Sequence, residues 1–80
     1  MSERLTEILG WLGVTAIVAA YAMASLQVIE VTNIWYPILN ILGAAGIVID
    51  AWSDKNYQPV VLNVIWIAVA VIAIGNILRV

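Results

Sequence analysis

Three long apolar segments constrain the fold of this chain more than any other feature of its sequence. They cover about residues 8–28, 34–52 and 59–78, and the linkers between them, "IEVTN" and "SDKNYQ", are short. Each segment is close to the roughly 20 residues that cross a hydrocarbon core of about 30 Å as a helix. Backbone groups in lipid must be hydrogen-bonded within their own segment, which favours helix even where β-branched residues abound. The sequence therefore predicts an all-α integral membrane protein, one domain of three antiparallel transmembrane helices running up, down and up.

The composition agrees with a membrane protein and excludes several functions. Of the 80 residues, 65% are hydrophobic and 10% charged, which is too little polar surface to cover a soluble domain of this length. The chain has no cysteine and no histidine, so disulfides and the usual metal ligands are excluded. We find no nucleophile–base pair and no phosphate-binding loop, so we expect no enzyme activity and no cofactor. The net charge of −2, without a basic run, gives no support for nucleic-acid binding.

The basic and aromatic residues give the expected orientation. Arg4 and Lys55 fall on one side of the membrane and Arg79 on the other. The positive-inside rule then favours a cytoplasmic N-terminus. Aromatic residues fit this register as two interfacial belts: Trp11, Trp52 and Tyr57 on the N-terminal side, and Trp35 and Tyr36 on the opposite side.

Small residues recur at helical spacing on one face of each of the first two helices. Small side chains let helix backbones approach closely, which drives helix packing in lipid. We therefore expect these residues to lie in helix contacts: Gly13, Ala16, Ala20 and Ala24 in the first helix, and Gly43 and Gly46 in the second.

A few polar and aromatic residues within the apolar segments have two interpretations. Asn63 and Trp66 share one face of the third helix and could line a solute path, with an amide for hydroxyl groups and an indole for an apolar ring face. Alternatively, Asn63 holds helix three to helix two through a hydrogen bond to Asp50. The candidates for a solute path are Asn63, Trp66, Asn40 and Asp50.

Asp50 is a carboxylate inside a membrane segment, which is costly and often functional. It lies close to the predicted end of the second helix. One interpretation is a carboxylate that reaches the headgroups or pairs with Lys55. The other is a relay for protons or cations.

Most of the chain resembles small uncharacterised bacterial membrane proteins with "ILNILGAAG"-like and "PVVLNVIW"-like segments. More distantly, "QPVVLNVIW" at the start of the third helix is similar to the SemiSWEET and PQ-loop half-transporters. That resemblance implies a three-helix protomer that dimerises around a sugar path. The sequence departs from the pattern in two places: Leu26 stands before Gln27 where the hinge proline is expected, and the middle of helix two has no tryptophan.

Two functions follow as expectations. The first is a half-transporter protomer that moves a small neutral solute, working as a homo-oligomer, with a dimer favoured. The second is a structural or accessory subunit that packs against a larger membrane complex. In both cases the expected location is the bilayer of a bacterial inner membrane.

Overall fold

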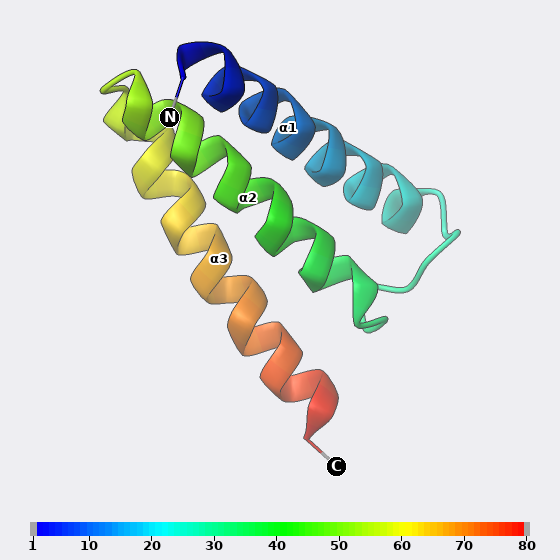
Figure 1. Ribbon diagram of the computed structural model, residues 1–80. Helices are drawn as coiled ribbons and strands as arrows, with labels where there is room; N and C mark the ends of the chain where they lie inside the picture. Colours follow the sequence, from blue (N-terminus) through cyan, green and yellow to red (C-terminus); the bar gives the residue numbers. More distant parts are fainter. Residues whose placement is uncertain (1, 80) are drawn as a thin grey trace.

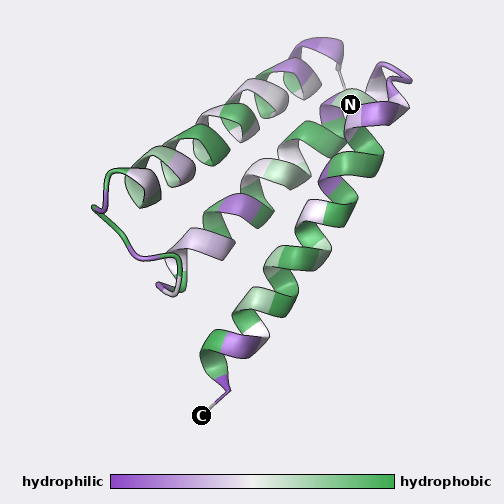
Figure 2. Ribbon diagram, turned by 180° about the vertical axis from the view of Figure 1, so that it is seen from behind, coloured by the Kyte–Doolittle hydropathy of each residue, from purple (hydrophilic) through white to green (hydrophobic). Residues whose placement is uncertain are grey.

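Three antiparallel helices make up the protein, and the computed structural model describes residues 2–79 of it (Figure 1). Helix α1 spans Glu3–Ser25, α2 spans Trp35–Ser53 and α3 spans Tyr57–Leu78. Each is long and apolar enough to cross a membrane. Hydrophilic residues gather toward the two ends of the molecule, with apolar residues along the helices between them (Figure 2). The predicted all-α, three-span membrane fold is confirmed.

Helix α2 is the central element of the fold. It packs against both α1 and α3, whereas α1 and α3 do not contact each other within the described residues. The N-terminus and the α2–α3 turn lie at one end, and the α1–α2 loop and the C-terminal end of α3 lie at the other (Figure 1). The result is an open arrangement rather than a closed bundle, and it leaves most large apolar side chains available to lipid or to another protein.

The first helix begins earlier than the sequence predicts, at Glu3 instead of residue 8. The Ser2 hydroxyl accepts a hydrogen bond from the Leu5 N–H at 3.1 Å and so caps the helix. A capped helix continues past its apolar stretch because the cap satisfies N–H groups that would otherwise lack partners. The first turn of α1 therefore carries charged residues that the prediction left outside the helix.

The first helix also ends earlier than predicted, at Ser25 instead of residue 28. Gln27 adopts the left-handed conformation with φ 64°. The Gln27 N–H donates to the Ala24 carbonyl at 3.1 Å, and the Val28 N–H donates to the Met23 carbonyl at 2.9 Å. This pair of bonds is a Schellman motif, which satisfies the last carbonyls and turns the chain out of the helix.

Helix α2 ends in the same way. Lys55 has φ 57°, and its N–H donates to the Trp52 carbonyl at 3.0 Å. The Asn56 N–H donates to the Ala51 carbonyl at 2.9 Å. Both helix ends thus place a residue with a side chain where glycine is the usual choice.

The two prolines lie in the first turns of their helices. Pro37 is the third residue of α2 and Pro59 the third residue of α3. An N–H in the first turn has no carbonyl four residues earlier in the helix to bond to, so the missing proton costs little there.

Glycines bring α1 and α2 into backbone contact. A methyl group added at Gly43 would lie 2.6 Å from the carbonyl oxygen of Gly13, and one added at Gly46 would lie 2.5 Å from that of Leu9. Gly13, Gly43 and Gly46 are buried, as is Ala20, while Ala16 and Ala24 are half-buried. The contact within a single chain therefore uses much of the small-residue face of α1.

Candidate solute site

Asn63 is buried between helices rather than exposed to a path. It is 7% exposed, and its Nδ2 donates to the Pro59 carbonyl of its own helix at 2.8 Å. The expected bond between Asn63 and Asp50 is not formed. The Asp50 side chain lies against Gly10 of α1, whereas Asn63 belongs to α3. A side chain directed at α1 cannot also meet α3.

Asn40 and Trp66 share one cavity between α2 and α3. Its volume is about 320 Å³. Asn40 is buried and donates from Nδ2 to the Tyr36 carbonyl at 2.8 Å, whereas Trp66 is 48% exposed. The cavity is lined by Val31, Tyr36, Pro37, Asn40, Trp66, Val69, Ala70 and Ala73.

The chemistry of this cavity is apolar with a few polar groups. Tyr36, Asn40 and Trp66 supply a hydroxyl, an amide and an indole N–H, and the other lining residues are apolar. No lining residue is charged. The volume lies near the lower end of the roughly 300–1,000 Å³ range of ligand sites, and an apolar wall with a small number of polar groups is their usual composition. An amide and an indole therefore do line one cavity, but the amide is that of Asn40, and Asn63 does not line it.

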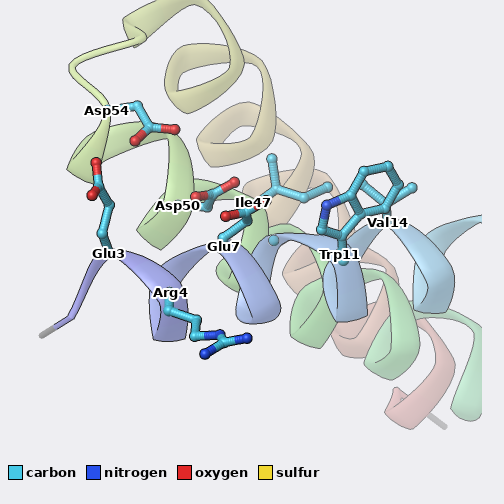
Figure 3. A pocket seen from close by; sticks show the side chains of 9 residues that line it. Glu3, Arg4, Glu7, Trp11, Val14, Ile47, Asp50 and Asp54 are labelled. Carbon is cyan, nitrogen blue, oxygen red and sulfur yellow. The ribbon is translucent and has the colours of Figure 1, made fainter.

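Asp50 lines a different cavity, between α1 and α2 at the end that carries the N-terminus. Its volume is about 680 Å³. Lys55, the expected partner of Asp50, is exposed and does not line it. The lining residues are Glu3, Arg4, Glu7, Gly10, Trp11, Val14, Ile47, Asp50 and Asp54 (Figure 3).

This second cavity is strongly acidic. Four of the five carboxylate side chains of the protein line it. Glu3 of α1 and Asp54, which directly follows α2, extend toward each other, whereas Arg4 is directed away from Asp54 (Figure 3). Within residues 2–79, no group of three or more carboxylates is arranged to hold a metal ion. The sequence prediction missed Glu3 and Glu7 because it started the helix at residue 8; a serine followed by glutamates is a typical helix start and would have placed them.

Both cavities lie on the same face of α2. Tyr36 and Asn40 line the apolar cavity, while Ile47 and Asp54 line the acidic one. Tyr36, Asn40 and Ile47 are spaced four and seven positions apart, which puts them on one stripe of α2, and Asp54 follows seven positions later, directly after the helix. Because α1 and α3 do not contact each other, this face of α2 lies in the groove between them, where Asn40 is buried and Tyr36 and Ile47 are half-buried. We call it the open face of α2.

A family model matches residues 6–80, which is nearly the whole chain. The protein belongs to this uncharacterised family. The small three-span membrane protein described above is thus a member of a family without an assigned activity. No curated protein and no solved structure matches the chain. The resemblance to the SemiSWEET half-transporters therefore finds no support in these comparisons.

Proposed function

We propose that this family member is one protomer of a homodimeric transporter for a small neutral solute. The open face of α2, with its two cavities, is the observation that carries the proposal. One cavity lies toward each end of α2, and α1 and α3 flank the face without contacting each other. A second copy placed over this face would turn two half-open cavities into an enclosed path.

Three helices in this arrangement do not surround a path on their own. Copies related by a two-fold axis present the same face to each other, which is the commonest way in which identical chains associate. The small residues of α1 do not supply this interface, because Gly13 and Ala20 are buried within the chain. The dimer contact is therefore assigned to the open face of α2 together with its rims on α1 and α3.

Cross-linking tests the proposed dimer. The chain has no cysteine, so a single introduced cysteine reports on one position. Ile47→Cys, on the open face, should cross-link to its copy in membranes treated with a short bifunctional thiol reagent. Leu42→Cys is the matched control, since Leu42 is 63% exposed but lies five residues away, on another face of α2. Equal cross-linking of the two variants, or cross-linking of Leu42→Cys alone, would contradict the proposed interface.

Flux tests the proposed transport. Protein reconstituted in liposomes should move one or more uncharged solutes from a panel that also contains amino acids and sugars. Trp66→Ala should lose this flux while keeping its helical circular dichroism, because the substitution removes the indole from the cavity without breaking the helix. If no solute moves although the Ile47→Cys variant cross-links, the protein forms the proposed dimer but does not transport these solutes.

A second candidate function, an accessory subunit of a larger complex, is favoured by one feature of α3. A methyl group added at Gly75 would meet nothing within 4 Å, and Ala68 and Asn76 are also exposed. Small exposed residues on a membrane helix permit close approach by another helix. Gly75→Leu should then disrupt the co-purification of a partner and leave the Ile47→Cys cross-link unchanged. A variant that co-purifies the same proteins as the wild type would remove the support for this function.

A further inference from the structure

We infer that the cavity formed by Tyr36, Asn40 and Trp66 binds uncharged amphiphilic molecules, with an apolar body and one or two hydrogen-bonding groups, rather than sugars or zwitterions. The inference rests on the proposed function in taking this cavity as part of the solute path. It goes beyond that function because the residues that line the cavity determine which class of molecule can bind.

The absence of charge in the walls excludes ionic ligands. Each of the eight residues that line the cavity is apolar or neutral. The four carboxylates that line the acidic cavity, Glu3, Glu7, Asp50 and Asp54, do not line this one. Moving an ionised group into an apolar site without an opposite charge is strongly unfavourable. An amino acid zwitterion or a carboxylate therefore has no partner here.

The number of hydrogen-bonding groups excludes sugars. Only three lining side chains are polar, and the Asn40 amide already donates one N–H to the Tyr36 carbonyl. A buried hydroxyl without a partner costs roughly 1–3 kcal/mol on the scale of protein mutations. A monosaccharide would bring more hydroxyl groups than these walls satisfy. A ligand with one or two polar groups would leave none unpaired.

The position of the cavity suits an amphiphile. Tyr36 and Pro37 belong to the first turn of α2, and Ala73 lies close to the C-terminal end of α3. The polar side chain of Tyr36 is thus near one membrane interface, while Trp66 and Val69 lie deeper along α3. A molecule with its polar group toward the interface and its apolar body toward Trp66 would match this gradient.

The test uses three probes with one apolar body and different charge: phenylethanol, phenylacetate and phenylethylamine, with glucose as the polyol. Protein with ¹⁵N-labelled tryptophan in nanodiscs gives one indole signal for each of its four tryptophans. Trp66→Phe identifies the Trp66 signal. Phenylethanol should shift this signal saturably, and the other three probes should need at least about tenfold higher concentration, a difference of roughly 1.4 kcal/mol.

Two variants in which an alanine is replaced by phenylalanine distinguish binding in the cavity from general partitioning of phenylethanol into lipid. Ala73→Phe fills the cavity and should abolish saturation by phenylethanol. Ala68→Phe adds the same ring on an exposed part of α3 and should leave it unchanged. A Trp66 response that survives Ala73→Phe, or equal responses to phenylethanol and glucose, would overturn the inference.

Glucose flux without phenylethanol binding would overturn the ligand class and keep the transporter. Phenylethanol binding without flux or cross-linking would keep the ligand class and reject the transporter.

Discussion

Gly13 of α1 and Gly43 of α2 face each other so closely that neither has room for a methyl group. A methyl group at either glycine would meet the carbonyl oxygen of the other. Because a carbonyl belongs to the backbone, it cannot turn aside as a flexible side chain can. The separation of α1 and α2 is therefore set by this pair.

Gly43→Ala should lower the free energy of unfolding by about 1–3 kcal/mol, the usual cost of overpacking. Gly75→Ala is the matched control, since a methyl group there meets nothing within 4 Å. It should be neutral or stabilising by up to about 1 kcal/mol, because alanine favours helix over glycine. Thermal unfolding in mild detergent measures both. Equal melting temperatures for the two variants would show that α1 and α2 are not held by this contact.

Ala20→Leu tests the same contact nearer the other end of α1. Ala20 is 0% exposed, whereas its neighbour Ala19 is exposed. The larger side chain at Ala20 should separate the helices and lower the melting temperature, although no apolar surface is lost. Ala19→Leu adds the same atoms on the lipid side and should leave the melting temperature near that of the wild type. A loss of stability in Ala19→Leu alone would reverse the assignment of faces on α1.

Gln27→Gly should stabilise the protein by about 1 kcal/mol, because a residue with a side chain is disfavoured in the left-handed conformation by roughly that amount. Gln27 has φ 64° and closes the Schellman motif of α1. Ala19→Gly is the control, since Ala19 is exposed and lies well inside α1, where glycine should destabilise. Chemical unfolding followed by circular dichroism measures the difference between the two variants. A loss of stability in Gln27→Gly would mean that the side chain of Gln27 matters more than its backbone conformation.

Asn63→Ala and Trp66→Ala should have different effects. Asn63 is buried and donates to the Pro59 carbonyl, so its removal should cost about 1 kcal/mol of stability and leave flux or ligand binding in place. Trp66 is 48% exposed, so Trp66→Ala should cost less than the roughly 3–5 kcal/mol typical of a buried tryptophan, and should abolish flux. Ile65→Ala, next to it and also exposed, is the control and should keep flux. If Asn63→Ala lost flux while its stability stayed unchanged, Asn63 would have to contact the solute after all.

Single-cysteine labelling tests the expected cytoplasmic N-terminus. Ser2 and Thr32 are exposed and lie at opposite ends of α1. An impermeant thiol reagent on intact cells should label Thr32→Cys and should label Ser2→Cys only after permeabilisation. The opposite pattern would show that the N-terminus lies outside the cell. Labelling of both variants on intact cells would contradict a membrane-spanning α1.

The sequence by itself determined the three membrane-spanning helices. Lipid leaves each segment no alternative to internal hydrogen bonding, so length and hydropathy were sufficient to predict them. The spacing of Gly13, Gly43 and Gly46 likewise identified the faces on which helices approach each other. The ends of α1 were predicted less well. They depend on the Ser2 cap and on the backbone of Gln27, which hydropathy does not report.

Only the tertiary structure decided which faces meet. Helical periodicity shows that Asn40 and Asp50 share the second helix, but it does not show which neighbour lies over each of them. The glycine contact turns Asp50 toward α1 and leaves Asn40 beside Trp66 on α3. The four residues that the sequence groups as one path are therefore divided between two cavities and a buried contact. The physical reason is that a helix fixes the direction of its side chains relative to its own axis, while its rotation against a neighbour is set by the closest backbone contact, here Gly13 against Gly43.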